Sequence, residues 1–211
     1  MTDRVTLIAD TAIDLVATRG MRGLTHRAVD AEAGLPPGST SAYYRTRKAL
    51  IEAVVARLAA LDLEEAATAD LPGTPDPALL APAMAAVLDH WMTTARNRTL
   101  ARYACMLEAT HHPELRSILN HGTEARSRAR QLLERAGIPD PDRKGRALVA
   151  YLDGLLFDRL VGAGALHAPP PGTPESQEDL THAVRAALQA VFQPPTTPPA
   201  PTTPRAPTTA T

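Results

Sequence analysis

The sequence predicts an all-α protein, and three observations support this prediction. Apolar residues recur at helical spacing along most of the chain, and no segment alternates with strand period over a useful length. Helix-start signals such as Asp76-Pro77 and helix-end glycines such as Gly34 separate the apolar segments. The 211 residues are 44% hydrophobic, which is enough for one core and a smaller satellite domain.

The N-terminal part is expected to form one longer helix followed in the chain by two short helices. Residues 4–18 carry apolar side chains at helical spacing and end at Arg19-Gly20. Thr25 is a good N-cap for the next helix, which Gly34 should terminate. Pro36-Pro37 should then begin a third helix, because proline is favoured in a first turn. This is the pattern of a helix-turn-helix unit, whose second helix enters the DNA major groove.

The residues of this unit are suited to contacting a DNA duplex. The third helix carries small hydroxyl side chains that can bond phosphate or base edges, and basic residues follow it. The net charge of the chain is −1, so DNA binding must come from local charge and from dimerisation. The candidate DNA-binding residues are Thr25, His26, Arg27, Gly38, Ser39, Thr40, Ser41, Tyr43, Tyr44, Arg47 and Lys48.

Several residues here follow a known family pattern at matching spacing: Ile8, Ala12, Leu15, Gly20, Leu24-Thr25, Ala33-Gly34, Gly38, Tyr43-Tyr44 and Arg47. Residues 4–55 therefore resemble the N-terminal domain of TetR-type transcriptional repressors. The resemblance implies an all-helical homodimer that releases operator DNA when a small molecule binds. Ser41 stands where the family usually has a phosphate-contacting tyrosine, and Asp30 stands where it usually has alanine. Thr40, Tyr44 and Arg47 also depart from the usual leucine, phenylalanine and lysine.

The remainder of the chain predicts a helical body. Thr46 should cap a long helix toward Ala69, and further helices are expected over 77–95, 98–110, 115–136, 142–161 and 175–192. Polarizable and aromatic residues on the middle helices are candidates for the effector pocket that the resemblance implies, although each is also suited to simple core packing. These residues are Met84, Trp91, Tyr103, Met106, Leu107, Tyr151 and Phe157.

The helices over 142–161 and 175–192 form the candidate dimer interface, because both carry apolar residues on wide arcs. Packed against their copies, they would form the intermolecular four-helix bundle that the resemblance implies. The alternative is that these arcs are buried within one protomer. The candidate interface residues are Leu148, Leu152, Leu155, Leu156, Val184, Leu188 and Val191.

The predicted domains are a DNA-binding domain over 1–48, an effector-binding and dimerisation domain over 49–193, and a Pro/Thr-rich tail over 194–211 expected to be disordered. The single cysteine, Cys105, fits a reducing cytoplasm and suits a buried packing role. We expect no signal peptide, no membrane span, no cofactor and no bound metal.

The favoured function is a ligand-responsive repressor that binds a palindromic operator in double-stranded DNA as a homodimer. No sequence motif typical of an enzyme is present, so catalysis is not expected. Two alternatives stay open. One is a regulator, repressing or activating, that responds to no effector. The other is a helical interaction module whose head has lost DNA affinity.

Overall fold

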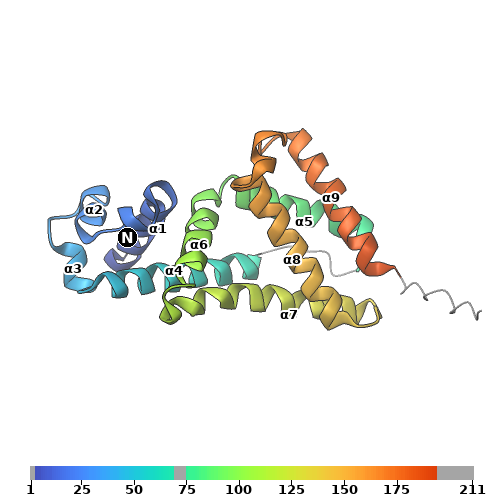
Figure 1. Ribbon diagram of the computed structural model, residues 1–211, viewed down its shortest axis with the longest axis horizontal. Coiled ribbons are helices and arrows are strands. Elements are labelled where there is room, and N and C mark those ends of the chain that lie inside the picture. Colours follow the sequence, from blue (N-terminus) through green and yellow to red (C-terminus); the bar gives the residue numbers. More distant parts are fainter. Residues whose placement is uncertain (1–2, 69–74, 194–211) are drawn as a thin grey trace, which may run out of the picture.

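The computed structural model describes residues 3–68 and 75–193, and all regular elements within these ranges are helices. The predicted tail over 194–211 and the predicted end of the long helix near Ala69 lie outside the described residues. Figure 1 shows a head formed by α1–α3 at one end, and α4 running from it into a body formed by the later helices. The elements are α1 (Arg4–Gly23), α2 (His26–Glu32), α3 (Ser39–Tyr43), α4 (Arg47–Thr68), α5 (Pro77–Met92), α6 (Arg96–Glu108), η1 (Pro113–Leu119), α7 (Asn120–Arg135), α8 (Pro141–Leu160), η2 (Ala163–Leu166) and α9 (Pro174–Phe192).

Three predicted helix-start signals are confirmed by their hydrogen bonds. The Thr25 hydroxyl accepts from the backbone N–H of Ala28 at 3.1 Å, at the start of α2. The Thr46 hydroxyl accepts from the backbone of Ala49 at 3.1 Å in the same way for α4. The Asp76 carboxylate accepts from the N–H of Ala78 at 2.9 Å, with Pro77 in the first turn of α5. Each cap satisfies a donor that the helix itself leaves unpaired.

Three predicted boundaries were wrong. The third helix begins at Ser39 rather than at Pro36, because Gly38 has a left-handed backbone with φ +90° that no α-helix contains. Gly20, with φ +66°, interrupts α1 as predicted, but helical backbone resumes and continues to Gly23. The helix predicted over 98–110 begins at Arg96, so Asn97 lies within it and its side chain donates to Asp14 of α1.

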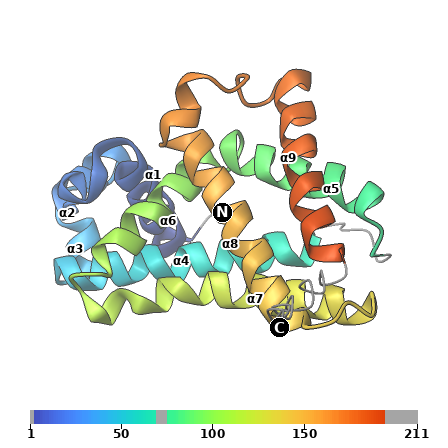
Figure 2. The same cartoon turned by 45° about the vertical axis from the view of Figure 1, so that its right-hand side comes forward.

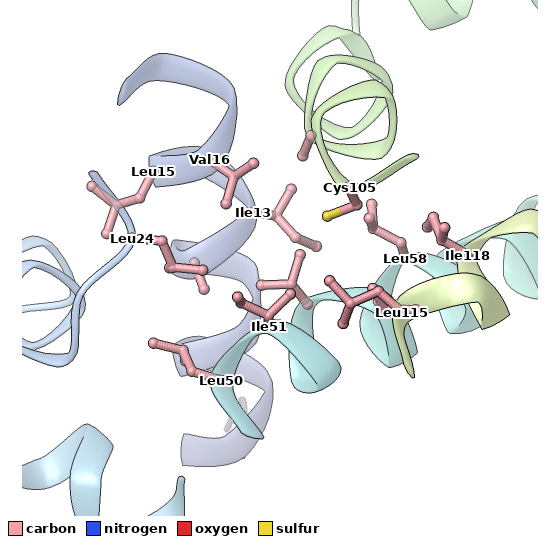
Figure 3. Packing of buried hydrophobic residues seen from close by; sticks show 14 of the residues in the cluster. Ile13, Leu15, Val16, Leu24, Leu50, Ile51, Leu58, Cys105, Leu115 and Ile118 are labelled. Atoms are coloured by element: carbon pink, nitrogen blue, oxygen red, sulfur yellow. The ribbon is translucent and has the colours of Figure 1, made fainter. Parts of the chain in front are cut away.

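The head and the first half of the body share one hydrophobic core. Ile8, Leu15 and Leu24 of the head region pack with Leu50 and Leu58 of α4, and all are fully buried. Side chains of α6 and η1 complete this core, as Figure 3 shows for Cys105, Leu115 and Ile118. The predicted domain boundary at residues 48 and 49 therefore lies beside residues that share a core. The boundary itself stays a prediction.

A second hydrophobic core joins the later helices. It lies among α5, α8 and α9, with Leu133 contributed by α7. Figures 1 and 2 both place α8 and α9 next to each other over α5. The buried members of this core include Leu80, Leu88, Leu148, Leu156, Leu180, Val184 and Leu188. Within the described residues, no helix is long and apolar enough to cross a membrane.

Candidate nucleic-acid interface and ligand cavity

The turn between α2 and α3 is built by two glycines in left-handed conformations. Gly34 ends α2 with φ +64°, and the N–H of Leu35 returns to the carbonyl of Asp30 at 2.8 Å. Gly38 precedes α3 with φ +90°, a conformation that side-chain-bearing residues rarely adopt. The turn thus fixes how α3 leaves α2, which is the geometric requirement of a helix-turn-helix unit.

The side chain of Asp30 accepts hydrogen bonds from the N-cap and the first turn of α3 and so fixes the start of this helix. Its Oδ2 accepts from the N–H of Gly38 at 2.7 Å. Its Oδ1 accepts from both the N–H and the hydroxyl of Thr40, at 2.7 and 2.6 Å. Burial by itself would raise the pKa of this carboxyl, but the bonds from Thr40 and Gly38 outweigh burial and lower its pKa. We call Asp30, Gly38 and Thr40 the α3 clamp.

The clamp corrects the prediction that Thr40 is an exposed residue available to bases. Thr40 is fully buried, because its hydroxyl and its N–H both turn inward to Asp30. The Ser39 hydroxyl donates to the carbonyl of Pro36 at 2.7 Å, and the Ser41 hydroxyl donates to the carbonyl of Gly38 at 2.8 Å. Of the three hydroxyl residues, only Ser41 is exposed.

The outer surface of the helix-turn-helix unit carries an aromatic hydroxyl and positive charge. The Tyr43 side chain is exposed on α3, and Arg27, Arg45 and Lys48 are exposed around it in the chain. Tyr44 is half-buried instead, and burial raises the pKa of its hydroxyl. One of the two adjacent tyrosines therefore faces outward and the other inward.

Two other predicted contact residues make bonds within the head. The Nε2 atom of His26 lies 2.5 Å from the carbonyl oxygen of Tyr44, which links α2 to the end of α3. The Arg47 guanidinium donates to the carbonyls of Leu24 at 2.5 Å and Met21 at 2.6 Å. Arg47 thereby satisfies carbonyls at the end of α1 and orients α4 against the head. Its predicted phosphate contact stays a prediction.

A cavity of about 910 Å³ lies in the body between α4, α5, η1, α7 and α8. Met84 and Trp91, two of the predicted pocket residues, line it. One face of α4 forms its wall, so the helix that leaves the head is also a boundary of the cavity. Most of the other lining side chains are apolar: Val55, Ala56, Ala59, Leu63, Leu80, Val87, Leu88, Leu115, Ile118, Ala125, Ala129, Leu132, Leu148, Val149 and Leu152.

The other predicted pocket residues do not line this cavity. Tyr103 packs edge-on against Phe157, with ring centroids 5.2 Å apart, and Met106 packs against the first core. Leu107, Tyr151 and Phe157 are exposed on the surface of the protomer. Leu148 and Leu152, which we predicted as interface residues, are found in the cavity wall. Aromatic residues are rare in this sequence, but the sequence does not show which face of each helix turns toward the cavity.

The predicted dimer residues are largely enclosed by their own protomer. Leu148, Leu156, Val184, Leu188 and Val191 are buried in the second core, and Leu152 and Leu155 are half-buried beside it. The five buried residues are therefore not available as an interface, and the prediction was wrong for them, whereas for Leu152 and Leu155 it stays a prediction. The arcs pack inward because α8 and α9 bury them against α5 and against each other. The alternative considered for these arcs, burial in one protomer, describes them correctly.

One exposed face of α8 consists mainly of small and apolar residues, while α8 also exposes the charged Asp142, Arg143, Arg146 and Asp153. Residues three or four positions apart share a helix face, and this spacing groups six exposed small or apolar residues on one side. Gly154 lies in the middle of this face, where a Cβ atom would meet no other heavy atom within 4 Å. We call this surface the outer α8 face: Ala147, Ala150, Tyr151, Gly154, Phe157 and Val161.

The described residues contain no group of three or more His, Cys, Asp or Glu side chains that could hold a metal ion. Cys105 is fully buried among apolar residues, and burial raises the pKa of its thiol to about 11. It is therefore a protonated packing residue rather than a nucleophile at neutral pH.

A helix-turn-helix head joined by one continuous helix to a helical body that contains a cavity defines a class, the helix-turn-helix transcription regulators. The family model described as "Tetracyclin repressor-like, C-terminal domain" matches residues 75–193, more than half of the chain. No curated protein matches the sequence.

Solved structures agree with this match. The multidrug binding protein EbrR, crystallised with imidazole, is 30% identical, with 93% of this chain and 99% of that chain covered and a TM-score of 0.62. A TetR-family member from Streptomyces coelicolor A3 is also 30% identical, covering 86% and 98% of the two chains, with a TM-score of 0.62. A transcriptional regulator from Rhodococcus sp. Rha1 shares the fold with a TM-score of 0.70 at 22% identity, covering 90% and 96%. The chain belongs to the tetracycline repressor-like (TetR) family of transcriptional regulators.

Proposed function

We propose that this protein is a homodimeric repressor that binds a palindromic operator and is released from it by a small molecule. The observation that carries the proposal is that α4 both follows the helix-turn-helix unit and forms a wall of the cavity. A ligand that fits only one position of α4 would therefore favour one spacing of the two heads. A ligand must bind the two states with different affinity if it is to shift the equilibrium between them.

The proposed DNA surface is the exposed part of the helix-turn-helix unit. Ser41 and Tyr43 present hydroxyl groups on α3, and Arg27 and Lys48 present charge on either side in the sequence. The α3 clamp supports this surface from within and makes no base contact itself. Thr25, which caps α2, is exposed at the start of that helix and belongs to the same surface.

The proposed interface between protomers is the outer α8 face together with the adjacent surface of α9. Exposed apolar patches of this kind mark sites of association. On α9, the small residues Ala183, Ala186 and Ala190 leave room for a second copy to approach. Two copies joined here would present two heads, as symmetric half-sites on DNA require.

The proposed effector has an apolar, aromatic body. The cavity is large enough for a drug-sized molecule, and its walls are mainly aliphatic with Trp91 on one side. EbrR, the 30% identical relative, has been crystallised with ethidium and with malachite green. A planar or propeller-shaped aromatic molecule of that size is therefore the first class to screen here.

The experiment that tests this function is in vitro selection of binding sites from random duplex DNA at moderate salt. An enriched palindrome is expected, with half-sites about 10 base pairs or a multiple apart, because each dimer presents two heads. The selected duplex is then used to screen ligands for release. A folded, dimeric protein that enriches no sequence would contradict the proposal and support the interaction module. A palindrome that no ligand releases would support the effector-independent regulator.

Removal of charge or hydroxyl from the exposed head should weaken operator binding. Arg27→Ala is expected to reduce affinity on all sequences and to lower the salt slope by about 1, because one phosphate contact is lost. Tyr43→Phe is expected to reduce affinity with little change in that slope. Fluorescence anisotropy at several salt concentrations measures both effects.

Arg143→Ala is the matched control for the charge change. This arginine is exposed in the first turn of α8, at the end of the body far from the head (Figure 1). It should leave both affinity and salt slope as in the wild type. If Arg27→Ala and Tyr43→Phe also leave affinity unchanged, the assignment of this surface to DNA is incorrect.

A further inference from the structure

Two ion pairs near the end of α4 lie at the boundary between the cavity and α6. The Arg102 guanidinium pairs with Asp62, and the Arg98 guanidinium pairs with Glu65. All four side chains are largely buried, with Arg102 only 4% and Asp62 14% exposed. We call Asp62 and Glu65 the cavity carboxylates, because both belong to the lining of the cavity, whereas the two arginines do not.

Glu65 is also bonded to the aromatic wall of the cavity. Its Oε1 accepts from the indole N–H of Trp91 at 2.6 Å and lies 3.8 Å from Nε2 of His90. The cavity carboxylates thus join three helices: α4 carries them, α6 supplies the arginines, and α5 supplies the indole. A group that binds these carboxylates from the cavity side would compete with contacts that hold α4 to α6.

Burial of the Arg102 guanidinium removes its hydration, and the ion pair with Asp62 offsets this loss only in part. Burial lowers the pKa of Arg102, an effect that the neighbouring Asp62 opposes. The Nε atoms of Arg98 and Arg102 are buried without a hydrogen-bond partner among the described residues. Transferring a charged group from water to the protein interior costs free energy, and an ion pair with imperfect geometry recovers only part of that cost. A cationic ligand therefore competes with arginines whose hydrogen bonds are incomplete.

The face of α6 that carries these arginines also contacts the head. Ala101 and Cys105 of α6 are buried in the first core beside Ile13 of α1, as Figure 3 shows for Cys105 and Ile13. The Asn97 amide donates to the Asp14 carboxylate of α1 at 2.9 Å. α6 therefore contacts both the end of α4, through these ion pairs, and the first helix of the head.

We propose that the effector is a hydrophobic cation that takes Asp62 and Glu65 from Arg102 and Arg98, and that this exchange frees the end of α4 from α6. The exchange alters how α6 supports α1, which changes the placement of the head. This inference rests on the proposed repressor function for its consequence on DNA. The preference of the cavity for a cation and the exchange of ion pairs do not depend on DNA and can be measured without it.

A pair of probes of equal shape and opposite charge tests the charge preference. Tetraphenylphosphonium and tetraphenylborate are titrated into the purified full chain, and binding is followed by the fluorescence of Trp91. This is the only tryptophan of the chain, and it lies in the cavity wall. The cation is expected to bind at least tenfold more tightly than the anion. Equal binding of the two probes, or tighter binding of the anion, would overturn the proposal.

Variants of the cavity carboxylates locate that preference. Asp62→Asn and Glu65→Gln are each expected to weaken binding of tetraphenylphosphonium at least fivefold. Glu64→Gln is the matched control, since Glu64 lies between them on α4 but is exposed, is paired with Arg57 and does not line the cavity. The control should stay within twofold of the wild type. Loss of affinity in the control alone, or in none of the three, would contradict the proposal.

Variants without the competing arginines distinguish an exchange of ion pairs from a simple attraction of the cation to the carboxylates. Arg98→Met and Arg102→Met should each tighten binding of tetraphenylphosphonium at least threefold, because each removes one arginine that competes with the cation for a carboxylate. Arg98 is less buried than Arg102, so Arg98→Met keeps the test available if Arg102→Met fails to fold. Weaker or unchanged binding to a folded Arg98→Met protein would overturn the exchange.

Release from DNA tests the coupling step separately. On the selected operator, tetraphenylphosphonium should release the wild type but not the Asp62→Asn and Glu65→Gln variants at the same concentration. Binding of the cation at the carboxylates without release would overturn the coupling. Failure to find any operator would contradict the repressor function, while the charge and exchange titrations, which need no DNA, would still decide the rest.

Discussion

Replacing Asp30 by alanine is expected to lower the free energy of unfolding by about 3 kcal/mol and to abolish operator binding, because it leaves three donors of the α3 clamp without their acceptor. The donors are the N–H groups of Gly38 and Thr40 and the hydroxyl of Thr40, all bonded to this one buried carboxylate. A helix of five residues, Ser39–Tyr43, has little stability of its own. Urea denaturation and anisotropy on the selected operator measure the two effects.

Two substitutions calibrate this result. Thr40→Val keeps the shape of the side chain and removes only its hydroxyl, so a loss of about 1 kcal/mol is expected. Glu32→Ala removes an exposed carboxylate from the same helix, where it pairs with Arg19 on the surface, and should cost less than about 0.5 kcal/mol. If Asp30→Ala is no more destabilising than Glu32→Ala, the clamp does not hold α3.

The ionisation of Asp30 adds a dependence on pH. Its pKa is lowered in the folded protein, so its contribution to stability is complete above the unfolded value of about 3.9 and is lost as the pH falls toward the folded value. Between about pH 5 and about pH 3, the wild type should therefore lose more unfolding free energy than Asp30→Ala, which has no carboxyl to protonate. Equal slopes for the two proteins would show that the carboxyl is not stabilised by folding.

If the protein forms the proposed dimer, replacing Gly154 by arginine is expected to convert that dimer into a folded monomer. The position is exposed, and a Cβ atom there meets no other heavy atom within 4 Å, so the protomer accommodates a side chain. In the proposed dimer, the same arginine would lie in the centre of the outer α8 face against its own copy. Burying unpaired like charges should raise the dimer dissociation constant about 100-fold or more, equivalent to about 3 kcal/mol.

Sedimentation velocity over a concentration series measures the dissociation constant, and circular dichroism reports whether the protomer stays helical. Gly154→Ala is the matched control: it should stabilise α8 by up to about 1 kcal/mol without adding charge. Operator binding by Gly154→Arg should fall with dimerisation. A Gly154→Arg protein that stays dimeric at low micromolar concentration would place the interface on another surface.

The helical class and most helix positions followed from the sequence because they depend on local chemistry. Thr25, Thr46 and Asp76 were predicted caps, and each makes the predicted side-chain bond to the following turn. Apolar spacing identified the helices of both cores in the same way. An error occurred where a single backbone conformation decided the boundary, as at Gly38.

The candidate sites were predicted less completely, because a side chain's role depends on which face of its helix meets another element. Thr40 has the right chemistry for a base contact, but Asp30, ten residues earlier, draws it into the interior. Asp30 itself was noticed only as a departure from the family pattern. This departure could have predicted the clamp, because an acidic residue replaces alanine next to a short polar helix.

The sequence by itself determined that this is an all-helical chain with a helix-turn-helix head, since periodicity, caps and glycines act within a few residues. Only the tertiary structure decided which apolar arcs close the two cores, which line the cavity and which stay exposed. Leu148 and Tyr151 are three residues apart on α8, yet one is buried against the cavity and the other faces outward. The reason is physical: helical spacing defines a face, but burial depends on neighbours that packing alone brings together.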